Sequence, residues 1–208
     1  MTMKNIITVI LEYAESAEYQ SCYCEENIYR LVKKLADAGV QRNNRVAFIS
    51  NTKKHVLLCQ QNASSRGDPY PVIWDYHVIA LFSLDDGDYV LDLDTRLGRL
   101  CRLDEYIQST FHSSTSKELR AWLHVVDAET FIASFASDRR HMIVDGQYLS
   151  PPPSWAPIRG KMSNTEHNLE EFIEGSFQPA SRLYIECGEA ISIALFKFQV
   201  DDDDDDEI

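Results

Sequence analysis

The feature that most constrains the fold is a long apolar run, followed by a predicted turn and a second strand-like segment. Residues 72–82 (VIWDYHVIALF) alternate between two faces that are both largely apolar, which is typical of a strand in the centre of a sheet. Residues 85–88 (DDGD) predict a tight turn, and residues 89–95 (YVLDLDT) predict the returning strand. We therefore expect a central antiparallel hairpin, against which the rest of the chain packs.

Three ionisable side chains share one face of this predicted hairpin. Direct pairing outward from the turn places Asp92 opposite Leu81 and brings Asp94 closer to His77 than Asp92. A histidine and two aspartates on a buried surface are costly unless they pair. Two interpretations remain open: a solvated outer face of the sheet, or a His–Asp pair in which the carboxylate sets the imidazole tautomer.

A cysteine stands at the start of the clearest helical pattern. Ile28 and Leu31 begin an apolar stripe at helical spacing, and Gly39 is placed to end the helix. Cys24 lies four residues before Ile28 and shares its inward face, whereas Cys22 does not. The positive end of a helix dipole favours the thiolate, which is the nucleophilic form. A cysteine that only packs in the core is the alternative.

The rest of the chain is predicted to form shorter elements, some helical and some extended. Residues 5–18 fit either a helix or an apolar arm. Strands are predicted over residues 45–50, 183–185 and 191–196. Helices are predicted over residues 103–111, 116–125, 127–135 and 168–173. We expect one α/β (α+β) domain over residues 1–200, followed by a disordered acidic tail over residues 201–208.

Charge and cysteine content narrow the possible partners. The net charge is −13, of which residues 201–207 carry seven negative charges, so the rest of the chain is also acidic. An acidic surface argues against nucleic acid or an anionic membrane as a partner. Five cysteines without regular spacing predict neither a disulfide framework nor a metal site. No signal peptide and no membrane span are recognisable, so we expect the protein to act in the cytoplasm or nucleus. We also expect it to be a monomer.

Four longer motifs are far more specific than these patterns. They are residues 21–27 (SCYCEEN), 71–78 (PVIWDYHV), 92–95 (DLDT) and 135–139 (FASDR). In this order, within residues 19–175, they resemble the protein N-terminal glutamine amidohydrolase family. The resemblance implies a papain/transglutaminase-like domain with a central, mostly antiparallel sheet flanked by helices. It also implies deamidation of N-terminal glutamine with release of ammonia, in the N-degron pathway and without a metal or other cofactor. Residues 175–200 do not resemble the family's ending.

The resemblance also assigns roles to individual residues. It implies a triad of Cys24 as the nucleophile, His77 as the base and Asp92 as the orienting carboxylate, although the ideal hairpin register favours Asp94. The substrates would be proteins or peptides with a free N-terminal glutamine. Candidate substrate-binding residues are Tyr23, Glu25, Trp74, Asp75, Phe135, Ser137 and Asp138.

Some of these candidates have a plainer explanation. Glu25 suits the first turn of a helix, where a carboxylate caps the N-terminus but would oppose a nearby thiolate. Trp74 could donate its indole N–H to an oxyanion, yet its predicted strand face is opposite to that of His77. Two other functions remain open: a peptidase or crosslinking enzyme with the same triad, and a non-catalytic protein that binds N-terminal glutamine.

Overall fold

The centre of the protein is a six-stranded antiparallel sheet with the strand order β12-β7-β1-β4-β5-β6. The computed structural model describes residues 3–40, 44–66, 70–111, 119–178 and 181–184. The strands of this sheet are β1 (Asn44–Ser50), β4 (His77–Leu84), β5 (Gly87–Leu91), β6 (Leu100–Arg102), β7 (Trp122–Asp127) and β12 (Ser181–Tyr184). The predicted β4–β5 hairpin is therefore present and lies within the sheet.

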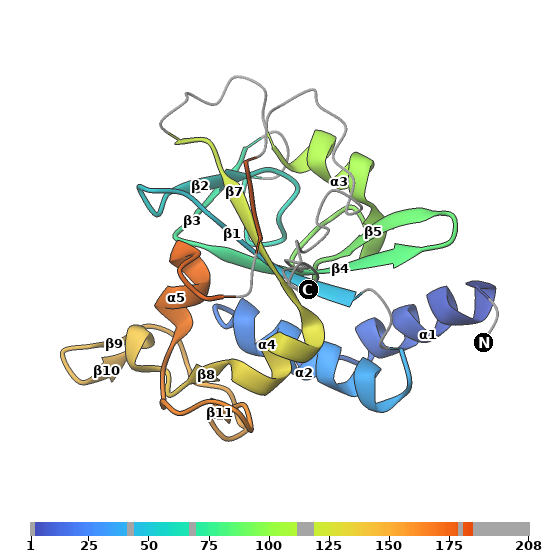
Figure 1. Ribbon diagram of the computed structural model, residues 1–208. Coiled ribbons are helices and arrows are strands. Elements are labelled where there is room, and N and C mark those ends of the chain that lie inside the picture. Colours follow the sequence, from blue (N-terminus) through green and yellow to red (C-terminus); the bar gives the residue numbers. More distant parts are fainter. Residues whose placement is uncertain (1–2, 41–43, 67–69, 112–118, 179–180, 185–208) are drawn as a thin grey trace, which may run out of the picture.

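Helices cover both faces of the sheet (Figure 1). One face carries α1 (Met3–Glu15), α2 (Cys24–Asp37), α4 (Ala128–Ser134) and α5 (Leu169–Glu174), and the other carries α3 (Leu103–Thr110). The two faces bury separate hydrophobic cores, and alternate residues of β1 enter one or the other: Phe48 faces α2 and α4, whereas Ile49 faces α3. This arrangement explains why both faces of the central strands are apolar.

Short ribbons lie outside the central sheet. They are β2 (Val56–Leu58) with β3 (Val72–Trp74), β8 (Ala136–Ser137) with β11 (Ile158–Arg159), and β9 (Ile143–Val144) with β10 (Gln147–Tyr148). A 3₁₀ turn, Arg140–Met142, precedes β9. The β9–β10 ribbon and the β2–β3 ribbon lie toward the same end of the molecule in Figure 1, with α5 between them.

The apolar run over residues 72–82 is not one strand, contrary to the sequence prediction. Its first part, β3, pairs with β2, and only the part from His77 onward joins the central sheet as β4. Between them the Asp75 carboxylate accepts the N–H of Tyr76 at 3.0 Å. Ile73 is 63% exposed, whereas Trp74 packs against the core that contains α3, so β3 lies at the edge of that core. The break changes where residues before His77 point.

The predicted register of the hairpin is also wrong, because each cross-strand partner is displaced by two residues. Leu84 pairs with Gly87, so that Leu81 lies opposite Val90 rather than Asp92. Gly87 is the first residue of β5 rather than part of the turn. Its φ of +136° is a conformation that residues with side chains disfavour. Because β5 ends at Leu91, Asp92 follows the strand.

The structure also tests the remaining predictions of helices and strands. Residues 5–18 are mostly helical, in α1. The helix predicted over residues 116–125 is wrong, because β7 occupies residues 122–127 and pairs with β1 and β12. The strand predicted over residues 191–196 and the acidic tail lie outside the described residues.

The overall class agrees with the sequence prediction. A mixed α/β architecture with an antiparallel central sheet and flanking helices is confirmed, whereas the finer papain/transglutaminase-like likeness remains a prediction. Within the described ranges, no helix combines the length and the apolar character needed to cross a bilayer.

Candidate active site

Cys24 is the first residue of α2, and the chain before it is held tightly. The Asn27 side chain accepts the N–H of Gln20 at 2.9 Å and donates to the Gln20 carbonyl at 2.8 Å, which clamps the approach to the helix. Cys24 is 7% exposed and belongs to the same core as Ile28, whereas Cys22 is exposed. The helical spacing therefore predicted correctly which of the two cysteines faces inward.

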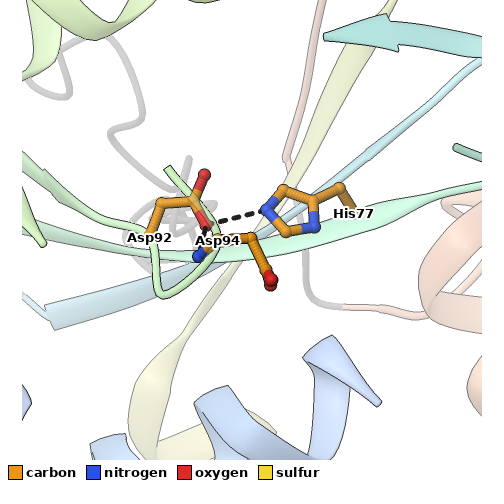
Figure 2. Close-up of side chains that lie close together, drawn as sticks. All are labelled: His77, Asp92 and Asp94. Carbon is orange, nitrogen blue, oxygen red and sulfur yellow. Dashed lines mark hydrogen bonds and ion pairs between the residues drawn. The ribbon is translucent and has the colours of Figure 1, made fainter. Parts of the chain in front are cut away.

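A buried imidazole–carboxylate pair lies at the start of β4 (Figure 2). The distance from His77 Nε2 to Asp92 Oδ1 is 2.9 Å, and both side chains are fully buried. Asp92 also accepts the Asp94 N–H at 2.8 Å, the Tyr106 hydroxyl at 2.8 Å and the Gln61 amide at 3.4 Å. Because these three groups are donors, Asp92 is an ionised acceptor and Nε2 of His77 carries a proton. Nδ1 of His77 has no hydrogen-bond partner among the described residues and is left to act as the base.

The electrostatics of this pair favour its charged form. Burial lowers the pKa of His77, but the charge and hydrogen bond of Asp92, together with the charge of Asp94, raise it above its usual value. Burial raises the pKa of Asp92, yet His77 and the surrounding donors hold it below its usual value. Each partner thus stabilises the charge of the other.

The thiol of Cys24 is in a less favourable environment for ionisation than its helix position predicts. Burial raises the pKa of Cys24 well above its usual value, and the charges of Glu25 and Asp94 raise it further. Cys24 Sγ lies only 3.7 Å from Glu25 Oε2, while the backbone amide of Val78 acts in the opposite direction. This environment favours the neutral thiol, whose proton a base would remove before attack.

Trp74 lies against the imidazole rather than on the opposite face. The rings of Trp74 and His77 stack with centroids 5.2 Å apart and planes inclined by 25°. The break between β3 and β4 makes this possible, because the two residues no longer belong to one continuous strand. The indole N–H is buried and has no hydrogen-bond partner among the described residues, which leaves it able to bind an acceptor.

Glu25 is fully buried beside the sulfur, although the sequence pattern favoured a helix-capping role at the surface. Its carboxylate accepts the Tyr76 hydroxyl at 2.9 Å, and Oε1 lies 3.5 Å from Nε2 of His141. Within the described ranges, no lysine or arginine pairs with it. Such a carboxylate is poorly compensated and favours the approach of a cation.

The neighbouring Glu26 is equally buried but fully paired. It accepts two hydrogen bonds from Arg139, at 2.8 and 2.9 Å, and one from the indole of Trp155 at 2.6 Å. Arg139 also donates to the carbonyls of Pro153 and Trp155. This ion pair ties the chain around residues 139–155 to the first turn of α2, next to Cys24.

The other predicted substrate-binding residues are dispersed. Tyr23 is fully buried and donates to the Ser150 carbonyl at 3.2 Å. Phe135 packs its ring against Phe131, with centroids 4.8 Å apart, and Ser137 accepts the N–H of the residue two positions later at 3.3 Å. These three side chains are buried and have partners within the fold.

The two remaining acidic candidates are more accessible. Asp75 is exposed, and its carboxylate accepts the next backbone N–H. Asp138 is half-buried and pairs with Arg140 at 2.9 Å, and His167 lies 3.4 Å away. Neither carboxylate forms a hydrogen bond with the His77–Asp92 pair in the part of the chain that the structure describes, so the predicted residues are not all gathered in one place.

Several residues at the site escaped the sequence reasoning. Tyr19 donates its hydroxyl to Asp94, while Tyr106 and Gln61 donate to Asp92. Aromatic hydroxyls in amphipathic segments look like ordinary packing residues, so no local signal distinguishes them. Arg139 was visible as part of the FASDR motif, but its partner was not.

The same cluster could in principle hold a cation. Ligand atoms of His77, Asp92 and Asp94 lie within 4.8 Å of one another. However, four donors already occupy the Asp92 carboxylate, which is the expected capacity of its two oxygens. The geometry therefore fits proton transfer better than metal ligation. A cysteine, an imidazole and an orienting carboxylate are the groups used in nucleophilic acyl transfer.

Comparison with known proteins gives a consistent result. The model of the family described as "N-terminal glutamine amidase" matches residues 19–197. The protein N-terminal glutamine amidohydrolase of Caenorhabditis elegans is 39% identical over 171 residues, which is 79% of this chain and 89% of the relative. That of Danio rerio is 38% identical over 172 residues, covering 79% and 83% of the two chains. That of Drosophila virilis is 39% identical over 162 residues, covering 74% and 77%.

The fold and the site thus define an α/β protein with a buried His–Asp pair and a cysteine at the start of a helix. The chain belongs to the N-terminal glutamine amidase family. The family match continues past Gly175 to residue 197, so it includes most of the segment that the sequence motifs left unmatched.

Proposed function

We propose that this protein hydrolyses the side-chain amide of an N-terminal glutamine in proteins and peptides, giving glutamate and ammonia. The observation that carries the proposal is the buried pair of His77 and Asp92, 2.9 Å apart, in a member of this family whose α2 begins at Cys24. In this proposal Cys24 is the nucleophile, His77 is the base and Asp92 orients the imidazole.

The reaction has two halves. Nδ1 of His77 takes the thiol proton as Cys24 Sγ attacks the carboxamide carbon, and the imidazolium then protonates the leaving nitrogen, so that ammonia departs and a γ-glutamyl thioester remains. In the second half His77 removes a proton from water, which attacks the thioester carbon. Collapse of that intermediate breaks the C–S bond, returns the proton to sulfur and releases glutamate. The raised pKa of Cys24 supports removal of its proton by a base rather than a resting ion pair.

Two N–H groups are suited to stabilise the oxyanion. The backbone N–H of Cys24 lies in the first turn of α2, where it has no partner within the helix. The buried, unpartnered indole N–H of Trp74, stacked on His77, is the second. One such donor is typically worth roughly 10²–10³ in kcat.

Recognition of a free N-terminus needs an acceptor for an ammonium group. Glu25 fits this role best, because it is a fully buried carboxylate next to Sγ without a lysine or arginine partner among the described residues. Asp75 and Asp138 are more accessible, and each already accepts hydrogen bonds from neighbouring residues. We assign Tyr23, Phe135 and Ser137 to the supporting wall of the site, since each is buried among other parts of the fold.

The biological setting follows from the family. An N-terminal glutamate is the kind of product that the N-degron pathway arginylates before degradation, so we expect the protein to act in the cytoplasm or nucleus. The acidic chain is suited to protein and peptide substrates rather than to nucleic acid. A second function, as a binding protein without activity, would require a defective triad, and the geometry of His77 and Asp92 does not favour this.

The test uses four peptides that differ only in their first residue: glutamine, acetyl-glutamine, asparagine and glutamate. Purified protein should release ammonia from the first alone, with a mass increase of the peptide by about one dalton as NH₂ is replaced by OH. Chain cleavage would identify a peptidase instead. If no ammonia appears from the glutamine peptide while circular dichroism shows a folded protein, the proposed function is wrong.

A further inference from the structure

Two aspartates lie beside His77, and their surroundings differ sharply. Asp92 is fully buried and accepts four hydrogen bonds, so its carboxylate is saturated. Asp94 is 6% exposed, and its carboxylate accepts one side-chain hydrogen bond among the described residues, from the hydroxyl of Tyr19. A carboxylate can accept about four hydrogen bonds. Asp94 therefore has unused acceptor capacity at a buried position.

Asp94 lies next to the proposed base, because ligand atoms of His77, Asp92 and Asp94 are all within 4.8 Å of one another. Figure 2 shows its carboxylate pointing away from that of Asp92. The charge of Asp94 also raises the pKa of both His77 and Cys24. Its partner Tyr19 is 44% exposed, so the Tyr19–Asp94 pair lies near the surface of the protein.

We propose that Asp94 is a specificity-determining residue that accepts an N–H of the substrate carboxamide and disfavours the carboxylate of the product. The proposal rests on the proposed function, since it assigns a role in binding glutamine and releasing glutamate. The hydroxyl of Tyr19 holds one oxygen of Asp94 in place and leaves the other for the ligand. Asp94 is thereby separated from the triad, in which Asp92 orients His77.

The chemistry of the two ligands explains the selectivity. A carboxamide has two N–H donors, and one of them can meet the free oxygen of Asp94. A carboxylate has no donor and carries a like charge, which is disfavoured beside a buried carboxylate. Burial already raises the pKa of Asp94, although His77 and Tyr19 oppose this, so an added donor would relieve an unfavourable charge. The reaction itself would convert a ligand that Asp94 binds into one that it repels.

The experiment measures binding alone, in a Cys24→Ala background that cannot form the thioester. Isothermal titration at pH 8 compares peptides beginning with glutamine and with glutamate. The Cys24→Ala protein should bind the glutamine peptide more tightly. Adding Asp94→Asn should weaken glutamine binding roughly tenfold, as for a lost hydrogen bond to a charged group, and should strengthen glutamate binding. The Gln/Glu affinity ratio should therefore fall by at least tenfold.

The matched control is Asp92→Asn in the same background. It makes the same change of charge in the same cluster, but the saturated carboxylate of Asp92 cannot accept the carboxamide N–H, so the Gln/Glu ratio should fall far less than in the Asp94 variant. An unchanged Gln/Glu ratio in the Asp94 variant, or the same fall in both variants, would overturn the assignment. If the Cys24→Ala protein binds neither peptide and the wild type releases no ammonia, the proposed function itself has failed.

A ligand-side test does not depend on the folding of the Asp94 variant. A peptide that begins with the γ-methyl ester of glutamate is uncharged like glutamine but has no N–H on its side chain. With Asp94 intact, it should bind the Cys24→Ala protein roughly tenfold more weakly than the glutamine peptide. Equal affinity for the ester and the amide would show that the protein accepts no hydrogen bond from the carboxamide N–H.

Discussion

Replacement of Asp92 by Asn tests the role of the orienting carboxylate most directly. Four donors converge on Asp92, including the ring N–H of His77. An asparagine offers one acceptor oxygen, and its NH₂ group would face at least one of these donors. If the NH₂ group faces His77, the imidazole must place its proton on Nδ1, which removes the base that would act on Cys24.

Asp92→Asn should have two effects, a fall in kcat and a lower pKa of His77. A wrong tautomer in a comparable triad lowers kcat by about 10⁴, so we expect a loss of roughly 10³–10⁴ for Asp92→Asn. The pKa of His77 is raised by Asp92 against the opposing effect of burial. Without the carboxylate charge, burial dominates and that pKa falls. Because His77 must be neutral to act as base, the acid limb of kcat/KM should shift to lower pH.

The assay is ammonia release from a peptide with N-terminal glutamine, measured between about pH 5 and pH 9. In the wild type, the acid limb should lie above the ordinary histidine pKa of about 6.5, since the pKa of His77 is raised. Tyr106→Phe is the control: it removes one donor to Asp92 but keeps the charge, so it should lower kcat only severalfold.

Two results would refute this reasoning. If Asp92→Asn keeps more than about a tenth of the wild-type kcat, the loss is far smaller than a displaced tautomer requires. If Asp94→Asn moves the acid limb further than Asp92→Asn does, the orienting carboxylate is Asp94. Circular dichroism of each variant separates both results from simple unfolding.

Three further predictions concern the rest of the site. Cys24→Ala should abolish ammonia release, whereas Cys22→Ala, at an exposed position, should leave kcat within about twofold; equal losses would contradict the choice of nucleophile. Trp74→Phe keeps a ring against His77 but removes the indole N–H, so kcat should fall by roughly 10² with KM little changed; an unaltered kcat would exclude an oxyanion role. Arg139→Met leaves the charge of Glu26 buried and unpaired and should lower the free energy of unfolding by about 3–5 kcal/mol in urea titrations; Glu26→Gln in the same chain should recover part of this loss.

Much of the fold could be predicted because its signals are local. The apolar stripe from Ile28 onward defines α2, and its spacing alone places Cys24 on the inward face. The alternating apolar run predicted the central hairpin, although with cross-strand partners displaced by two residues. The FASDR motif included Arg139, yet nothing local indicated that this arginine pairs with Glu26.

The errors have a common physical cause. The apolar sequence of residues 122–126 is compatible with helix or strand, and the pairing of β7 with β1 and β12 decides the matter. The break at Asp75 and Tyr76 likewise cannot be read from alternation, because residues 72–74 are apolar yet belong to a different ribbon. In both cases a contact with a distant strand outweighs the local preference.

The sequence by itself determined that a cysteine begins the inward face of a helix and that His77 lies close to two aspartates. These facts depend on side-chain periodicity, which is a property of neighbouring residues. The family resemblance implied that Asp92 orients His77, whereas the ideal hairpin register favoured Asp94. Only the tertiary structure decided that Asp92 is in contact with His77 and saturated, that Trp74 stacks on the imidazole, and that Glu25 is buried beside the sulfur. These outcomes depend on where β5 ends, on the break between β3 and β4, and on what packs over α2. Contacts between residues far apart in the chain determine all three.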